Sequence, residues 1–224
     1  MSERILGNPA PGRDFQESRL ALQFGHPDGR YGRWVGRAMR ILNAIPNRRA
    51  IAMLDIAETD DVLELGFGPG HALRALARRA IRGSVTGIDQ SATMLAAARA
   101  HNRRAIAEGQ MRLLHGSFER IPLANASIDK ILAVNIAYFI SPLGHSLDEA
   151  RRVLRPGGLM SLYVTDYSAM RWAQFAGPET YQMFDAAGLR AFLRASPFAE
   201  DRVTIHRIRL PLGFRGLVAA IRKN

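Results

Sequence analysis

The sequence predicts an α/β fold: a seven-stranded, mostly parallel sheet with helices on both faces and a C-terminal antiparallel hairpin. Strand-like and helix-like patterns alternate from residue 61 to residue 165 with short turns between them, which is typical of a parallel sheet covered on both faces. A glycine-rich loop separates the first strand pattern from the first helix pattern of this region. The last two strand patterns, Arg202–Leu210 and Phe214–Arg222, are joined by only three residues, so they are expected to pair as an antiparallel hairpin at a sheet edge.

The composition is that of a single globular domain. The chain has 224 residues, of which 47% are hydrophobic and 23% are charged. It has no uninterrupted apolar run of about 18 residues, so we expect no membrane-spanning helix. The first residues carry no apolar run of signal-peptide length, and a cytoplasmic location is therefore the expectation. The absence of cysteine excludes disulfides, thiolate metal sites and a cysteine nucleophile, and no metal centre is expected.

The net charge of +11 leaves two interpretations open. Arginine supplies most of it, and Asp28 is the single acid between Arg19 and Ala52. Such a balance favours anionic partners, whether nucleic acid, a membrane surface or acidic small molecules. The alternative is a basic surface that is merely solvated. Charge alone does not decide between the two.

Periodicity and turn residues assign the elements in order. A loose leader and a loop, Phe24–Tyr31, precede an amphipathic helix over Arg33–Leu54, which Pro46 is expected to break into two. Residues 1–56 are thus a leader and helical cap, and residues 57–224 form the main domain. In that domain the predicted strands before the hairpin are Asp61–Leu65, Ser84–Ile88, Met111–His115, Ile128–Ile136 and Leu159–Thr165, the last of them after a turn at Pro156-Gly157-Gly158. The predicted helices are His71–Arg82, Ser91–Ala107 with Ser91 as its N-cap, Ser146–Leu154 and Pro178–Ala195.

The loop Gly66-Phe67-Gly68-Pro69-Gly70 follows a strand and opens a helix. Glycines allow positive φ and a close approach of the backbone to a ligand, and the helix N-terminus offers unpaired N–H groups. A dinucleotide site would require a further glycine where His71 stands, and a phosphate-binding P-loop would require Gly-Lys-Ser/Thr, so neither pattern is present. A ligand loop of another kind and a plain turn are the two remaining interpretations.

Asp89 ends the second predicted strand, 19 residues beyond Gly70. A carboxylate at a strand tip of this kind can accept hydrogen bonds from both hydroxyls of a ribose. The alternative is that Asp89 caps the helix that follows it. The glycine loop one unit earlier favours the ribose interpretation.

Four segments together resemble a known family: VLELGFGPG, VTGIDQSATM, HGSFERIPLANASIDKILAVNIAYF and RVLRPGGLMSL. They resemble the successive motifs of class I S-adenosylmethionine-dependent methyltransferases of the ubiquinone/menaquinone-biosynthesis type (methyltransferase type 11). The likeness extends from about Asp60 to the C-terminus and implies a Rossmann-like fold. It also implies S-adenosylmethionine as the cofactor, S-adenosylhomocysteine as its product, and residues 57–224 as the domain that binds it.

The resemblance also implies roles for individual residues. The methionine part of the cofactor would lie against Glu64, Gly66, Gly68 and Gly70, with Phe67 in the same loop, and the ribose would bind Asp89. The adenine would lie between Gln90 and Met94 and meet Ser117 and Phe118 at its edge, while Asn135 and Ile136 would lie under the methionine and the sulfonium. The family commonly has an acid where Ser117 stands, so the hydrogen bond to the adenine amino group is expected to be weaker or to pass to the backbone of Phe118.

The predicted function is methyl transfer to a small-molecule or lipid-like acceptor by in-line displacement, with the reacting atoms placed about 3 Å apart by the cleft. A general base is needed only if the acceptor is a hydroxyl, a thiol or an acidic carbon. Candidate catalytic residues at the carboxyl ends of the fourth and fifth strands are Tyr138 and Asp166, with His145 as a weaker candidate. Candidate substrate or lid residues are His26, Tyr31 and Tyr167.

Other functions stay open at this point. A nucleic-acid methyltransferase would explain the basic charge, but the fourth strand ends in Asn135-Ile136-Ala137-Tyr138 and not in Asn-Pro-Pro-Tyr, so nucleic acid is the less favoured partner. A cofactor-binding protein without catalysis is a further alternative. The arginine-rich helix near Trp34 is interpreted either as a cap over the substrate pocket or as a contact with anionic membrane. The sequence leaves the oligomeric state undetermined.

Overall fold

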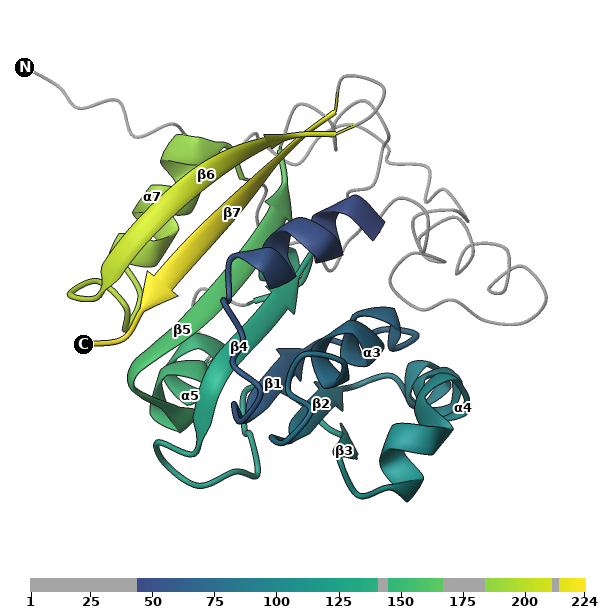
Figure 1. Cartoon of the computed structure of the whole chain (residues 1–224). Coiled ribbons are helices and arrows are strands. Elements are labelled where there is room, and N and C mark those ends of the chain that lie inside the picture. The colour runs from purple at the N-terminus through teal and green to yellow at the C-terminus, as the bar shows by residue number, and fades with distance from the viewer. Residues whose placement is uncertain (1–43, 141–144, 167–183, 211–213) are drawn as a thin grey trace, which may run out of the picture.

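The structure is a computed structural model that describes residues 44–140, 145–166, 184–210 and 214–224 (Figure 1). Seven strands form one sheet in the order β3-β2-β1-β4-β5-β7-β6. The strands are β1 (Val62–Leu65), β2 (Val85–Asp89), β3 (Met111–His115), β4 (Ile128–Val134), β5 (Leu154–Thr165), β6 (Arg202–Arg209) and β7 (Arg215–Arg222). The helices are α3 (His71–Ala77), α4 (Ala92–Ala107), α5 (Ser146–Val153), α7 (Ala186–Arg194), the short 3-10 helix η1 (Ala137–Phe139) and a helix over residues 44–52.

The strand pairing confirms the predicted sheet. Strands β1 to β5 pair in parallel, whereas β7 is antiparallel to both β5 and β6. Because β7 is reversed between them, β6 runs in the same direction as β1 to β5. The chain order changes direction at β1, which has β2 on one side and β4 on the other. In open α/β sheets such a switch point is where ligands bind, beyond the carboxyl ends of the strands.

The hydrophobic core lies in two layers, one on each face of the sheet. Alternate side chains of β1 enter different layers, Leu63 and Leu65 on one face and Val62 on the other, as a strand's period of two requires. The first layer also receives Leu189 and Leu193 of α7 together with side chains of α5. The second receives side chains of α3, α4 and the helix over residues 44–52. In Figure 1, α5 and α7 lie behind the sheet and the helix over residues 44–52 lies in front.

The predicted helix His71–Arg82 ends earlier, at Ala77. The backbone N–H groups of Arg79 and Ala80 both bond to the carbonyl of Leu76, which tightens the last turn and ends the helix. The N–H of Arg82 then bonds to the carbonyl of Glu58 at 2.8 Å. The segment after α3 is therefore held by a neighbouring turn rather than by its own helical pattern.

Strand β5 begins at Leu154, five residues before its predicted start. Leu154 pairs with Ile128, and the register then shifts so that Leu159 pairs with Lys130. The residues predicted to form a separate turn lie inside the strand because Gly157, at φ +76°, donates its N–H to the carbonyl of Lys223 at 2.8 Å. A glycine-containing irregularity in a strand replaces the expected turn.

Helix α7 begins at Ala186, not at Pro178. Phe184 and Asp185 precede the helix, Asp185 in an extended conformation, and residues 178–183 lie outside the described residues. The carboxylate of Asp185 accepts a hydrogen bond from the N–H of Gly188 at 2.7 Å and so caps the helix.

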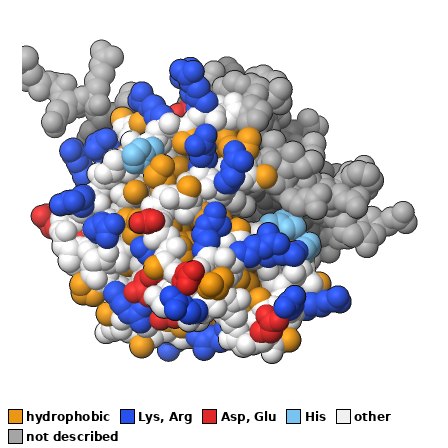
Figure 2. Space-filling model, viewed as in Figure 1, with side chains coloured by type: hydrophobic (Ala, Val, Ile, Leu, Met, Phe, Trp, Pro, Cys, Tyr) orange, Lys and Arg blue, Asp and Glu red, His pale blue; other side chains and the backbone are white. Residues whose placement is uncertain are grey.

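Of the predicted helix Arg33–Leu54, the structure describes residues from 44 onward. Pro46 lies in the first described turn of the helix over residues 44–52, and the expected break there involves residues before 44, which lie outside the described residues. Arg48 and Arg49 are exposed. The earlier part of the helix, including Trp34, lies outside the described residues. Figure 2 shows Lys and Arg side chains spread over the viewed face with fewer acidic ones between them. Within the described ranges, no helix is both long enough and apolar enough to cross a membrane.

Candidate functional site

The glycine loop joins β1 to α3 at the sheet's switch point. Gly66, Gly68 and Gly70 have φ values of +64°, +52° and +80°, the left-handed region that favours glycine. Gly70 is the N-cap of α3. The predicted succession of strand, loop and helix is therefore confirmed.

The space around these glycines differs from one to the next. A Cβ atom on Gly66 would collide with Cγ2 of Ile136, and one on Gly70 would lie 2.7 Å from Nδ2 of Asn102. A Cβ atom on Gly68 would meet no protein atom within 4 Å. The two ends of the loop are thus packed against the protein, whereas its middle borders open space that a ligand can occupy.

Asp89, the last residue of β2, is 7% exposed and holds the loop from the side. One carboxylate oxygen, Oδ2, accepts the N–H of Gly68 at 2.8 Å, and Oδ1 accepts the N–H of Ser91 at 2.9 Å. The cap of α4 is Ser91, whose Oγ accepts the N–H of Met94 at 3.2 Å. The alternative interpretation of Asp89 as the helix cap is therefore wrong, and the prediction that Ser91 is the cap is confirmed.

A second carboxyl group, that of Glu64 on β1, lies close to Asp89. Glu64 is 3% exposed, and its Oε2 has no hydrogen-bond partner in the described part of the chain. Burial first, and then the negative charge of Asp89, raise the pKa of Glu64 well above its usual range. Burial also raises the pKa of Asp89, although the N–H bonds from Ser91 and Gly68 act in the opposite direction. Burial and the neighbouring carboxylate thus favour the protonated form of Glu64, and a cationic group placed beside the pair would favour its charged form.

The residues expected around the adenine lie after β2 and β3. Gln90 is exposed, and its backbone carbonyl oxygen lies 2.9 Å from Nε2 of His115. Met94 is half-buried in the first turn of α4. Ser117 is exposed, but its Oγ already accepts the N–H of Glu119 at 3.1 Å, and the Phe118 side chain is 8% exposed. The expected adenine contacts are thus gathered at neighbouring strand ends.

A hydrogen-bond network joins the end of β4 to the end of β5. Asn135 has a φ of +57°, and its Oδ1 lies 3.2 Å from both the Tyr138 hydroxyl and Oγ1 of Thr165. The Tyr138 hydroxyl also accepts the N–H of Thr165. Tyr138 is 3% exposed, and burial raises its pKa above the usual value. Its place in this network supports a positioning role for Tyr138 rather than that of a base.

The other candidates are dispersed or lie outside the described residues. Asp166 follows β5 at the same edge, half-buried, and its N–H bonds to the carbonyl of Arg215 at 3.0 Å. His145 is exposed, with Nδ1 3.5 Å from Oδ2 of Asp148. Nothing can be placed for three candidates, since these positions are not among the described residues: His26, Tyr31 and Tyr167. Among the residues that are described, no three His, Asp or Glu side chains are grouped as a metal site would require.

Two predicted site residues direct their side chains into the core. Phe67 is 4% exposed and packs in the layer under α3 and α4. Only its backbone therefore faces the open side of the loop. Ile136 is 6% exposed and packs in the opposite layer while also touching the loop at Gly66.

Sequence reasoning missed Asn102, which supports the loop from α4. Its buried side chain donates to the carbonyls of Gly70 at 3.0 Å and of Ala98 at 2.9 Å. The signal available in the sequence was an asparagine one helical turn after Ala98, on the face of α4 that packs inward. A polar residue at such a position needs a partner, and here the partner is the carbonyl of Gly70 in the glycine loop.

Comparison with known proteins identifies the family. Residues 63–162 match a family described as a methyltransferase domain. The chain is 32% identical over 158 residues to the uncharacterized methyltransferase YdaC of Bacillus subtilis (strain 168), covering 69% of this chain and 84% of YdaC. It is 33% identical over 159 residues to a demethylmenaquinone methyltransferase of Tropheryma whipplei (strain Twist), covering 70% of this chain and 62% of that protein.

Solved structures share the fold. A chain from the complex of the Haloferax volcanii Trm112 methyltransferase activator with a methyltransferase superposes with a TM-score of 0.70 at 22% identity, covering 87% of this chain and 96% of that one. Geranyl diphosphate C-methyltransferase from Streptomyces coelicolor A3(2), solved with S-adenosyl-L-homocysteine, has a TM-score of 0.66 at 16% identity, covering 93% and 85%. The order of motifs, the sheet topology and the YdaC relationship agree, and the chain therefore belongs to the class I S-adenosylmethionine-dependent methyltransferases.

Proposed function

We propose that this methyltransferase acts on a small-molecule acceptor that binds beside the ends of β4 and β5. The observation that carries the proposal is the packing of Ile136 against Gly66, which puts the end of β4 directly beside the glycine loop. A cofactor lying over Gly68 would then have Asn135 and the network of β4 and β5 as its neighbours. One cleft could hold the cofactor and the acceptor together.

The loop and the strand tips fit S-adenosylmethionine. Each Asp89 oxygen accepts one backbone N–H, and a carboxylate has about four acceptor positions, so each oxygen can still accept a ribose hydroxyl. The open space over Gly68 suits the close approach of the methionine part. The partnerless Oε2 of Glu64 is an acceptor for which that part of the cofactor offers an ammonium group.

The protein's contribution to methyl transfer is placement. When bound, S-adenosylmethionine supplies a methyl group that its sulfonium has already activated. Tyr138 and Thr165 hold the Asn135 side chain in one orientation at the cleft, and the high pKa of Tyr138 leaves that hydroxyl protonated. Holding the acceptor in line with the methyl–sulfur bond is then the main source of rate enhancement. Asp166 is the carboxylate at this edge that could orient an acceptor.

The relatives support a small acceptor. Proteins similar to this chain include the demethylmenaquinone methyltransferase described above and a malonyl-[acyl-carrier protein] O-methyltransferase of Pectobacterium atrosepticum, at 30% identity over 148 residues. Phe139 follows Tyr138 on η1, and this large hydrophobic side chain is 38% exposed. An apolar or lipid-like acceptor could pack against the Phe139 ring. The nucleic-acid alternative has no comparable support.

Two measurements test the proposal. Calorimetric titration with S-adenosylmethionine should show saturable binding by the full chain. An assay for S-adenosylhomocysteine release should then show turnover with a member of a panel of quinones, fatty acids and small phenols, and none with duplex DNA or transfer RNA. Methylation of nucleic acid would refute the choice of acceptor. Tight cofactor binding without turnover on any small molecule in the panel would favour the non-catalytic alternative.

A further inference from the structure

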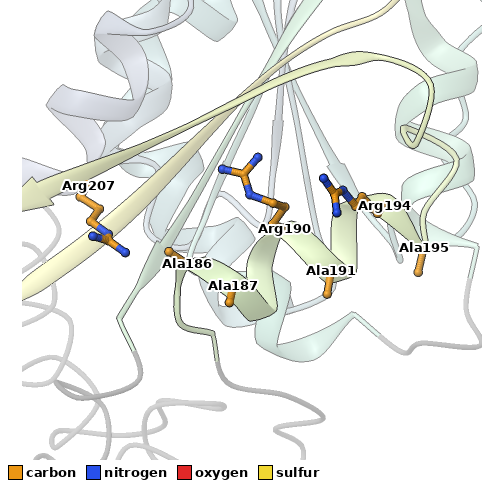
Figure 3. Close-up of a pocket in the computed structure, with 7 residues that line it drawn as sticks. All are labelled: Ala186, Ala187, Arg190, Ala191, Arg194, Ala195 and Arg207. Atoms are coloured by element: carbon orange, nitrogen blue, oxygen red, sulfur yellow. The ribbon is translucent and has the colours of Figure 1, made fainter. Parts of the chain in front are cut away.

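A second groove lies between α7 and β6, away from the glycine loop. It has a volume of about 740 Å³ and is lined by Arg190 and Arg194 of α7, Arg207 of β6, three alanines of α7 and Ala195, which follows that helix. In Figure 3, Arg190 and Arg194 rise from successive turns of the helix, and Arg207 extends from the strand toward the end of the helix where Ala186 lies. Three arginines from two elements thus line one groove together with a row of small side chains.

The charge of this groove is not balanced by the described part of the protein. Each of the three arginines is exposed, none has a hydrogen-bond or ion-pair partner among the described residues, and no described acidic side chain lines the groove. Arginines elsewhere differ in this respect: Arg151 pairs with Asp201 at 2.8 Å, and Arg152 pairs with Glu149 at 2.6 Å. Three neighbouring positive charges repel one another, and an anion bound between them would remove that repulsion.

The groove is distinct from the cofactor loop. Arg207 and α7 lie on the face of the sheet where Ile205 and Leu189 pack, whereas α3 and α4, which flank the loop, cover the opposite face. Across the sheet, Arg207 is level with Val164 of β5, because both pair with Leu217 of β7. Strands β5 and β7 therefore separate the groove from β4 and the loop.

We propose that this groove binds a small ligand that carries two adjacent phosphate groups. Guanidinium groups form paired, charge-assisted hydrogen bonds with phosphate oxygens, and arginine is the side chain best suited to that geometry. Three guanidinium groups on two sides of a groove match a diphosphate better than a single phosphate. Among the described residues, the lining has no aromatic side chain on which bases would stack and no large hydrophobic side chain that would enter a membrane. These features favour a small diphosphate over nucleic acid or lipid bilayer.

A simpler explanation covers only part of the cluster. Charged side chains on an edge strand prevent unwanted strand pairing, and Arg207 lies on the edge strand β6. A basic side chain in the last turn of a helix compensates the helix dipole, which accounts for Arg194. Neither reason requires Arg190, and neither requires the three to share a groove.

Inorganic pyrophosphate is the probe for the test. Calorimetric titration of the full chain at low salt should show saturable binding with one site per chain. The Arg190→Gln and Arg207→Gln variants should each bind at least about tenfold more weakly, since each loses charge-assisted hydrogen bonds to the phosphate oxygens. The matched control is Arg103→Gln, which removes an exposed arginine of α4 and should leave the affinity unchanged. Thermal melts should show that all three variants stay folded.

Three results would overturn the proposal. Equal weakening in Arg103→Gln would mean that pyrophosphate responds only to the overall charge. Displacement of S-adenosylhomocysteine by pyrophosphate would place the anion in the cofactor site. Failure of pyrophosphate to bind, while duplex DNA or phosphatidylglycerol vesicles bind and lose affinity in the groove variants, would assign the surface to a macromolecule. None of these outcomes depends on the acceptor of the methyl group.

Discussion

The carboxylate of Asp89 accepts a hydrogen bond from the backbone N–H of Gly68 at 2.8 Å, so the tip of β2 fixes the loop that follows β1. The two residues are 21 positions apart in the sequence. The same carboxylate has a second backbone donor in Ser91. Asp89 is thus held in place before any ligand arrives, which lowers the entropic cost of using it as a ligand group.

The Asp89→Ala variant should bind S-adenosylmethionine about tenfold to a hundredfold more weakly, because hydrogen bonds to a charged acceptor are worth about 1.5–3 kcal/mol. It should also melt earlier, since the N–H groups of Gly68 and Ser91 lose their acceptor. The matched control is Ser91→Ala, which loses the cap of α4 at a cost of about 1 kcal/mol but keeps the ribose acceptor. Calorimetry and thermal melts separate the two effects. An Asp89→Ala protein that binds like the parent would rule out the ribose contact.

Gly68→Ala tests the open space in the loop. Both Gly68 and Gly109 have positive φ, and a Cβ atom on either meets no protein atom within 4 Å. Alanine at each position should therefore cost a similar amount of unfolding free energy, about 1–2 kcal/mol. Only Gly68→Ala should weaken S-adenosylmethionine binding, because Gly109 lies at the far end of α4. Equal cofactor affinity in the two variants would show that the cofactor lies elsewhere.

The pH dependence of stability should reveal Glu64. The pKa of Glu64 is raised in the folded state. The contribution of Glu64 to the free energy of unfolding is therefore fully present below the usual pKa of 4.5 and is lost as the pH rises through the folded-state pKa. Glu64→Gln removes this loss. In urea denaturation without cofactor, the free energy of unfolding of the variant relative to the parent should therefore rise above pH 4.5, by up to about 1.4 kcal/mol per pH unit. Parallel pH profiles for the two proteins would contradict the buried, protonated carboxyl group.

Tyr138→Phe separates a positioning role from a catalytic one. Loss of the hydroxyl leaves the N–H of Thr165 without its partner and should lower the unfolding free energy by about 1–3 kcal/mol. Tyr163→Phe is the control, because among the described residues that hydroxyl makes one contact, at 3.3 Å with Oγ1 of Thr165, and its loss should cost less. S-adenosylmethionine affinity should be retained in both. Complete loss of turnover in a Tyr138→Phe protein of parental stability would restore Tyr138 as a catalytic group.

Local pattern predicted most elements of the fold. Strand β3 was predicted at its observed bounds, and α4 differs from its prediction by one residue. Periodicity and capping residues act over a few positions, so the chain itself carries that information. Two of the errors lie where distant segments decide: Lys223 accepts the N–H of Gly157 within β5, and Glu58 accepts the N–H of Arg82 after α3 ends. Such contacts have no signature in the local sequence.

The sequence by itself determined the order of strands and helices, the glycine loop and the strand-tip position of Asp89, because each of these follows from residues within a few positions of one another. Only the tertiary structure decided that Glu64 is buried beside Asp89, that Tyr138 bonds with Thr165 and that Arg190 and Arg207 border one groove. Those relationships depend on strand order and register, which place residues from distant parts of the chain side by side. Short-range pattern carries the family's motifs, and long-range packing sets the charge and the hydrogen bonds around them.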